Sequence, residues 1–356
     1  MTTREEDAAR TIIVGVDTHK DVHVAVAIDL LGVRLDEFVA PANAGGYSKL
    51  EQWAQALGRP VAFGVEGTAS YGQGLSSYLS RRGHRVTEVN RADRSARRRS
   101  GKSDPLDAEA AARAVLSGVA TAIPKLREGA VEMIRFLKVA KDSAVKARSQ
   151  ALITLKALLV TAPEQLREAL TGLTDLKLIE RCARLQARTM TCPRNAASAA
   201  VRSIARRWME LDREIKAHVA ELDRLTSEAC PTMVAAFGIG SDTAAEMLLV
   251  AGDDPSRIHS EAAFAALCGA CPIPASSGKT SRHRLNRGGH RQANAALYRV
   301  TIVRMRWHQP TIDYVARRTA EGKTKAEIIR CLKRYVAREV FGYLRSKGPE
   351  PLPAAP

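Results

Sequence analysis

Residues 11–40, TIIVGVDTHKDVHVAVAIDLLGVRLDEFVA, set the fold of the first third of this chain. The run TIIVGVD at 11–17 is almost continuously apolar, as in a strand buried on both faces. VHVAVAID at 22–29 and VRLDEFVA at 33–40 are two further β-rich runs. Short turns separate the three runs, which predicts antiparallel hairpins.

The residues that follow alternate between helix and strand patterns. Residues 45–58 place Leu50, Trp53 and Leu57 on one helical face. VAFGVEG at 61–67 is a short buried strand, residues 71–83 form a helix ended by Gly83, and HRVTEVN at 84–90 is a fifth strand. Three strands, a helix, a strand, a helix and a strand predict an α/β domain with a mixed sheet.

The charge of the chain indicates a polyanionic partner. The formal net charge is +17, from 55 Lys+Arg against 38 Asp+Glu. A basic solvated surface is the simpler interpretation, but the charge is clustered, which favours nucleic acid. One cluster lies at 91–102, beside a single acid, and another at 262–312, which has no acid. The candidate nucleic-acid-binding residues are Arg94, Arg97, Arg98, Arg99, Lys102, Lys279, Arg282, Arg284, Arg287 and Arg291.

Composition argues against membrane and secreted classes. No apolar run approaches the roughly 20 residues of a membrane helix, and the polar N-terminus MTTREEDAAR lacks a signal-peptide core, so we expect a cytoplasmic protein. Six scattered cysteines do not suggest a disulfide framework. Cys268 and Cys271 form a lone C-x-x-C pair, and since zinc needs about four ligands we interpret both as core residues.

The rest of the chain is predicted to be mainly helical. We expect domains at 8–120, 121–230 and 231–346, with a disordered tail at 347–356. Residues 128–230 look all-helical. Apolar residues between 204 and 225 recur every three or four positions and form one stripe, which is typical of a coiled coil or helix bundle. It could pack inside the chain, but we slightly favour an intersubunit or interdomain role. Its members are Ile204, Trp208, Leu211, Ile215, Leu222 and Leu225.

Four acids stand out by position. Asp17 ends the first strand and Glu66 the fourth, while Asp104 and Asp107 lie three apart at a helix start and can share one face. If the two strands are neighbours, all four carboxylates can meet and hold Mg²⁺ or Mn²⁺. Two such ions could promote phosphodiester cleavage. Taken singly, helix capping by Asp104 and Asp107, and turn or capping roles for Asp17 and Glu66, are simpler interpretations.

Three segments together resemble a known family. VGVDTHKDVHVAVAID at 14–29, VEGTASYG at 65–72 and KSDPLDAEAAARA at 102–114 are similar to the RuvC-like domain of DEDD transposases. These belong to the insertion-sequence one-ten family, related to the Piv invertase. The resemblance implies an RNase H-like fold and carries the family's four catalytic, metal-binding acids onto Asp17, Glu66, Asp104 and Asp107. His19 belongs to the same turn as Asp17 and is assigned no catalytic role.

A serine loop follows in PASSGKTSRHRLNRGGHRQANAALYR at 274–299. Its cations could hold a scissile phosphate, and Gly278 would let the backbone come close. On chemistry alone, a phosphate-binding loop in which the serines only donate hydrogen bonds is the better interpretation. The loop also resembles the family's C-terminal domain, whose S-G-K…R-G-G signature includes a catalytic serine. The resemblance assigns that role to Ser277, with Ser276 as the alternative after a one-residue shift.

The resemblance also implies partners. It predicts a recombinase that binds donor and target DNA and a guide RNA, assembled as a homo-oligomer, either a dimer or a tetramer. The turn at 237–240 resembles a helix–hairpin–helix turn that could bind phosphates, although a plain helix start is nearly as good. Two other functions remain open: a RuvC-like metal-dependent junction-resolving nuclease without a covalent intermediate, and a non-catalytic nucleic-acid-binding protein.

Overall fold

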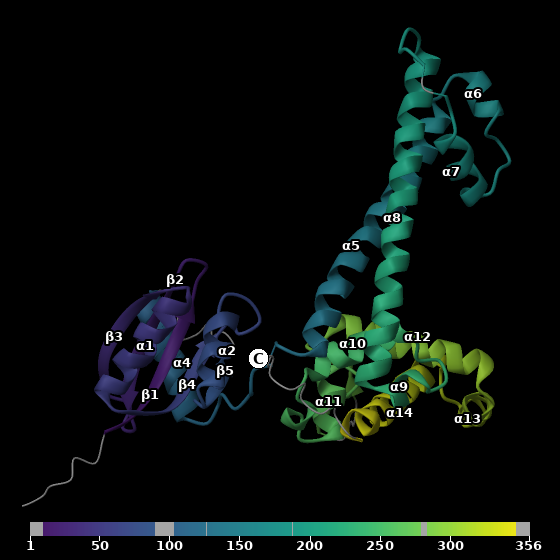
Figure 1. Cartoon of the computed structure of the whole chain (residues 1–356). Coiled ribbons are helices and arrows are strands. Elements are labelled where there is room, and N and C mark those ends of the chain that lie inside the picture. The colour runs from purple at the N-terminus through teal and green to yellow at the C-terminus, as the bar shows by residue number, and fades with distance from the viewer. Residues whose placement is uncertain (1–9, 90–102, 126, 187, 279–282, 347–356) are drawn as a thin grey trace, which may run out of the picture. The chain divides into compact units, whose positions relative to one another are not determined.

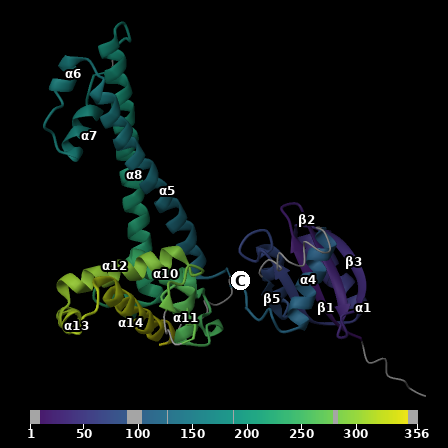
Figure 2. The ribbon, with the colours of Figure 1, turned by 180° about the vertical axis from the view of Figure 1, so that it is seen from behind.

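The computed structural model describes residues 10–89, 103–125, 127–186, 188–278 and 283–346. The chain divides between Arg127 and Glu128 into two compact units (Figures 1 and 2). The expected disordered tail at 347–356 lies outside the described residues. Among the described helices, none is both long and apolar enough for a membrane span.

The first unit contains a five-stranded sheet in the order β3-β2-β1-β4-β5. The β1–β2 and β2–β3 pairs are antiparallel, whereas β4 runs parallel to β1 and β5 parallel to β4. The predicted α/β domain with a mixed sheet is therefore confirmed, including both N-terminal hairpins. The strands are β1 Thr11–Thr18, β2 Val22–Asp29, β3 Arg34–Pro41, β4 Arg59–Glu66 and β5 Val86–Val89.

Helices cover both faces of this sheet. Even-numbered residues of β1, such as Val14, pack with α1 (Ala44–Leu57) and α2 (Gln73–Arg81). Odd-numbered residues, such as Ile13, pack with α4 (Asp104–Leu116) on the other face. Because strand side chains alternate between faces, Asp17 belongs to the α4 face.

The second unit contains two long helices, α5 (Ala130–Val160) and α8 (Pro193–Ala229), which run antiparallel (Figure 1). The short helices α6 (Glu164–Glu168) and α7 (Asp175–Ala183) pack where α5 ends and α8 begins. The remaining elements gather at the other end of the pair. These are α9 Pro231–Val234, α10 Ser241–Ala251, the short 3₁₀ helix Pro255–Arg257, α11 Glu261–Leu267, β6 Ile273–Pro274, β7 His283–Arg284, α12 Arg291–Trp307, α13 Gln309–Ala320 and α14 Lys325–Arg345.

The apolar stripe of α8 packs within the chain. Its N-terminal part, including Ile204 and Trp208, joins a core with α5, α6 and α7. Its C-terminal part, with Leu222 and Leu225, joins the core built by α9 to α14. The slightly favoured intersubunit or interdomain role is therefore not needed to explain the stripe, because α5 and the neighbouring helices of the same unit cover it.

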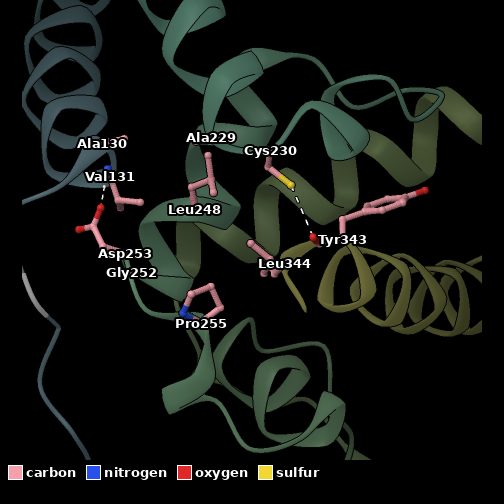
Figure 3. Close-up of a pocket in the computed structure, with 10 residues that line it drawn as sticks. All are labelled: Ala130, Val131, Ala229, Cys230, Leu248, Gly252, Asp253, Pro255, Tyr343 and Leu344. Carbon is pink, nitrogen blue, oxygen red and sulfur yellow. Dashed lines mark hydrogen bonds between the residues drawn. The ribbon is translucent and has the colours of Figure 1, made fainter. Parts of the chain in front are cut away.

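The base of α5 is tied to the loop after α10. Asp253 accepts a hydrogen bond of 2.9 Å from the backbone N–H of Val131 (Figure 3). This satisfies one of the N–H groups that every helix start leaves without an internal partner. Beside it is a cavity of only about 20 Å³ with mostly apolar walls. This junction is a packed core rather than a ligand site.

Candidate functional site

Two of the predicted acids lie side by side at the sheet edge. The parallel register pairs Val16 with Val65, so Asp17 and Glu66 are the next residues of their strands. Both are buried, at 7% and 8% exposure. The adjoining Thr18 hydroxyl donates a 2.9 Å hydrogen bond to the carbonyl of Glu66, which ties the two strand ends together.

The start of α4 brings the other two acids to this edge. Asp107 is buried, and the side chain of Asp104 is 47% exposed. Burial raises the pKa of Asp17, and both acids lie close enough to that carboxylate for their negative charge to add to the rise. The residue before the helix is Ser103, so Asp104 is the first helical residue and not the cap. The capping interpretation of Asp104 is therefore wrong, and Asp107 lies one residue further into the helix than that interpretation requires.

Two glycines let α4 lie directly on the strands. A Cβ on Gly15 would stand 2.0 Å from the carbonyl oxygen of Ala108, and one on Gly64 would stand 2.7 Å from Val115. Neither strand could carry a larger side chain there unless the helix moved away. The small residues thus set the depth at which the α4 carboxylates meet those of the sheet.

His19 joins this group from the turn between β1 and β2. Its Nε2 lies 3.2 Å from a carboxylate oxygen of Asp17 and 3.3 Å from one of Asp104. One ligand atom from each of these three residues lies within 4.8 Å of the other two. The sequence analysis assigned His19 no role, because the direction of a turn side chain depends on how α4 approaches.

The electrostatics of the cluster favour a bound cation. Burial raises the pKa of Asp17 above its ordinary value, His19 opposes that rise, and Asp104 and Asp107 add to it. Gathered carboxylates repel one another in a poorly solvated site, and a divalent cation relieves that repulsion. Carboxylate oxygens suit Mg²⁺ and Mn²⁺, and one imidazole nitrogen is compatible with Mn²⁺. These residues therefore fit a divalent metal ion.

The serine loop belongs to the second unit. Ser276 and Ser277 follow β6 and are exposed, and Gly278 has a positive φ of +54°, which favours glycine. Arg284 lies in β7, Arg287 in the turn after it, and Arg291 opens α12; all three are exposed. Lys279 and Arg282 lie outside the described residues, as do Arg94, Arg97, Arg98, Arg99 and Lys102.

The R-G-G turn after β7 is held by close backbone packing. A Cβ on Gly289 would meet the backbone N of Gly269 at 2.2 Å, so only glycine fits. Asn294 donates hydrogen bonds of 3.0 and 2.9 Å to the carbonyls of Cys268 and Gly269. Cys268 is fully buried, and burial raises its pKa to about 12, in agreement with the predicted core role. Backbone packing and hydrogen bonds therefore fix this turn against the residues that follow α11.

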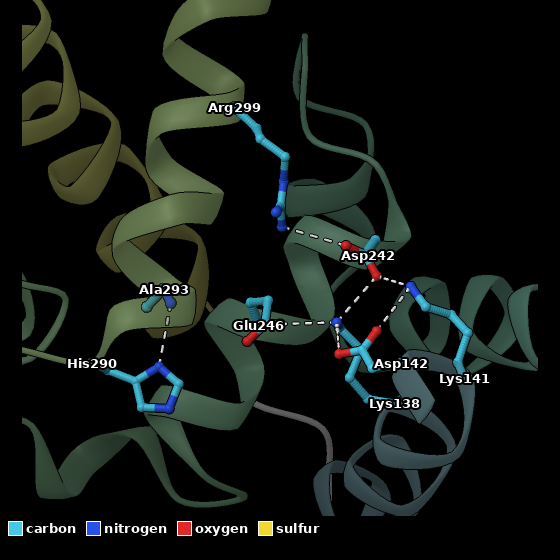
Figure 4. Close-up of polar contacts among 8 residues, drawn as sticks. All are labelled: Lys138, Lys141, Asp142, Asp242, Glu246, His290, Ala293 and Arg299. Atoms are coloured by element: carbon cyan, nitrogen blue, oxygen red, sulfur yellow. Dashed lines mark hydrogen bonds and ion pairs between the residues drawn. The ribbon is translucent and has the colours of Figure 1, made fainter. Parts of the chain in front are cut away.

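The Gly-Ile-Gly turn at 238–240 precedes α10, as a helix–hairpin–helix unit requires. The first turn of α10, however, already carries an acid. Asp242, in the first turn of α10, lies within ion-pair distance of Lys138, Lys141 and Arg299 (Figure 4). Lys138 also contacts Asp142 at 2.7 Å and Glu246 at 2.9 Å. Three cations face three carboxylates, so this network joins α5, α10 and α12 and leaves no net charge for a phosphate.

Arg304 is a further cation with a structural role. It is buried, pairs with both carboxylate oxygens of Glu339, and donates a 2.8 Å hydrogen bond to the carbonyl of Phe237. This bond fixes the turn at 237–240 against α12. At the other end of α12, His290 caps the helix start, because its Nδ1 accepts a 3.2 Å hydrogen bond from the N–H of Ala293 (Figure 4).

Comparison with known protein families gives matches to the region of the four acids and to the region of the serine loop. A family model described as Transposase matches residues 14–162, which include the four acids. A second, described as Transposase IS116/IS110/IS902 family, matches residues 234–316, which include the serine loop. No curated protein matches the chain. The two matches lie in the order that the resemblance predicted, and they span more than half of the 356 residues. The chain therefore belongs to the IS110 family of transposases, enzymes that cut and rejoin DNA.

Proposed function

We propose that this transposase cuts and rejoins DNA with two chemical groups, a metal-bound acidic site and a serine nucleophile. The observation that carries the proposal is the convergence of Asp17, Glu66, Asp104 and Asp107 at one sheet edge. Helix capping and strand turns do not require two acids at neighbouring strand ends to share a face with two at a helix start.

The four acids, with His19 beside them, would hold the divalent ion. When bound, Mg²⁺ or Mn²⁺ would supply positive charge that stabilises the attacking and leaving oxygens of a phosphodiester. The buried carboxylates of Asp17, Glu66 and Asp107 would fix the ion on rigid elements. The more exposed Asp104 and His19 would define the side that faces DNA.

Ser277 would be the nucleophile. Its Oγ would form a bond to the scissile phosphorus while the phosphorus–oxygen bond of the DNA strand breaks, and the serine proton would be lost as the leaving oxygen gains one. A DNA hydroxyl would then attack the phosphoserine and release the serine. The strand would thus be exchanged without hydrolysis. Arg284, Arg287 and Arg291 would balance the charge that develops on the phosphate oxygens.

Donor DNA, target DNA and a guide RNA are the proposed partners, in a homo-oligomer of two or four chains. Membership of the family supports DNA as the substrate. RNA guidance and oligomerisation rest on the resemblance alone. The cation clusters at 91–102 and 279–291 would contact phosphates and position the nucleic acids without reading sequence.

The test is a trap for the covalent intermediate. Full-length protein would be incubated with labelled element-end DNA, RNA copurified from cells that carry the element, and Mg²⁺ or Mn²⁺, and then run on a denaturing gel. We expect a protein–DNA adduct that Ser277→Ala abolishes and Ser276→Ala retains. Asp104→Asn should also abolish the adduct while nucleic-acid binding survives, because it removes a metal ligand and no phosphate contact.

The other results separate the alternatives. An adduct lost only in Ser276→Ala would move the nucleophile by one residue. Cleavage without an adduct, unaffected by either serine change, would indicate a metal-dependent junction-resolving nuclease. Unchanged activity in cells after Asp17→Ala would indicate a protein that only binds nucleic acid.

A further inference from the structure

The tip of the α5–α8 pair, where α5 ends and α8 begins, carries a cavity that the transposase matches do not cover. The cavity measures about 300 Å³. Its lining comes from α6, α7, the loop after α7 and the first turns of α8. Figure 1 shows these elements together at one end of the α5–α8 pair. All of its lining residues fall between residues 162 and 234, outside both family matches. Its charged lining residues are Arg181, Arg184, Arg188 and Arg194.

The charged groups of the lining are all cationic. It contains four arginines and no aspartate or glutamate. Among the described residues, no carboxylate forms a salt bridge with Arg181, Arg184, Arg188 or Arg194. Further along α8, by contrast, Arg213 is paired with Glu210 and Arg224 with two glutamates. Four like charges around one cavity repel each other, and a polyanion would relieve that repulsion.

The position of Arg194 also favours a bound anion. It lies in the first turn of α8, a helix of 37 residues whose first turn contains no acid. The start of a helix carries partial positive charge, so a cation there is unfavourable and a bound anion is stabilised. The side chain of Arg194 donates a 2.5 Å hydrogen bond to Gln165 of α6, which holds the guanidinium at the cavity wall.

The residue types favour a phosphate-binding site over a surface that is merely basic. Between residues 181 and 209 the chain has seven arginines, no lysine and no acid. Solubility would be served equally by lysine, whereas the planar guanidinium matches phosphate oxygens in pairs. The amides of Gln165, Gln186 and Asn195 add hydrogen-bonding groups beside an apolar floor of Leu166 and Leu185. This combination suits a nucleotide better than a bare ion.

We propose that this arginine cavity binds the phosphodiester backbone of a nucleic acid at the tip of the α5–α8 pair. Arg194 stands some 35 residues before the end of α8, which corresponds to about 50 Å of helix. The tip therefore contacts a stretch of nucleic acid about 15 base pairs away from one bound at the opposite end of α8. The contact does not depend on which serine is the nucleophile, because it concerns binding alone.

The test compares two double variants of the full chain. Arg184→Gln with Arg194→Gln removes two charges from the cavity. Lys146→Gln with Arg213→Gln removes two charges from exposed positions on α5 and α8 and is the matched control. Binding would be measured by fluorescence anisotropy over a range of salt concentrations. The probes would be a DNA duplex of about 30 base pairs, twice the distance spanned by α8, and an RNA hairpin of similar length. Circular dichroism would check that both variants fold.

We expect the cavity variant to bind at least one probe about tenfold more weakly at 0.1 M salt, with a salt slope lower by about 1 to 2. The control should stay within about twofold of the wild type. Loss confined to the hairpin would identify RNA as the ligand, and loss confined to the duplex would identify DNA. Unchanged affinity and slope for both probes, or an equal loss in the control, would overturn the proposal.

Discussion

Replacement of Gly15 by alanine tests whether the seating of α4 on β1 sets the geometry of the acidic site. The new Cβ would lie 2.0 Å from the Ala108 carbonyl oxygen and 2.3 Å from the Ala112 nitrogen, where ordinary contacts begin at 3.4 Å. Both neighbours are helix backbone and cannot rotate away. The helix must therefore retreat by about 1.4 Å at the oxygen contact, carrying Asp104 and Asp107 with it.

The expected result follows from that displacement. Overpacking of this kind costs about 1–3 kcal/mol in unfolding free energy, so the protein should still fold. A shift of about 1 Å in catalytic groups can lower a rate about 100-fold. We therefore expect DNA cleavage by Gly15→Ala to fall about 100-fold and Mn²⁺ affinity to fall with it.

Cleavage of labelled element-end DNA and a Mn²⁺ titration would measure the two effects, with urea unfolding as the check on stability. Gly45→Ala is the matched control, since its Cβ would meet nothing closer than 3.5 Å. If folded Gly15→Ala cleaved DNA and bound Mn²⁺ like the wild type, α4 would not position the acids as we argue.

Two further predictions concern His19 and the half-buried Glu339. His19→Asn should lower Mn²⁺ affinity about tenfold and Mg²⁺ affinity less, because Mn²⁺ accepts imidazole nitrogen more readily. Competition titrations would measure the ratio of the Mn²⁺ affinity to the Mg²⁺ affinity. An unchanged ratio would mean that His19 is not a ligand. Burial alone would raise the pKa of Glu339, but hydrogen bonds from Arg304 and Tyr343 lower it below its ordinary 4.5. The stabilisation that the Glu339 carboxylate gives to the folded protein should therefore be present at neutral pH and lost as pH falls through the lowered pKa. Glu339→Gln should cost about 1–3 kcal/mol in urea unfolding at pH 7 and little at pH 3, with Glu321→Gln as an exposed control near zero. A cost independent of pH would exclude the ion pair as its source.

The sheet and the four acids could be predicted because their signals are local. Apolar runs mark β1, β2 and β4, and an acid that ends a buried strand stands out against them. His19 could not be assigned a role, since its position between Asp17 and Asp104 depends on α4 approaching from residues far along the chain. The stripe of α8 was recognised, but amphipathic spacing identifies a buried face and not its partner. The arginine cavity had a signal in the acid-free stretch at 181–209, but only the folding of α6 and α7 onto α8 turns that stretch into a cavity.

Burial and pairing separate the structural cations of the second unit from those available to nucleic acid. Lys138 and Arg304 are buried and face carboxylates, so each is already neutralised by the fold. Arg184 and Arg287 are exposed, and neither forms a salt bridge with any residue in the described part of the chain. The exposed, unpaired arginines of the serine loop and the arginine cavity lie towards opposite ends of α8. A polyanion attracted to both must extend along the α5–α8 pair, which a nucleic acid can do and a small anionic ligand cannot.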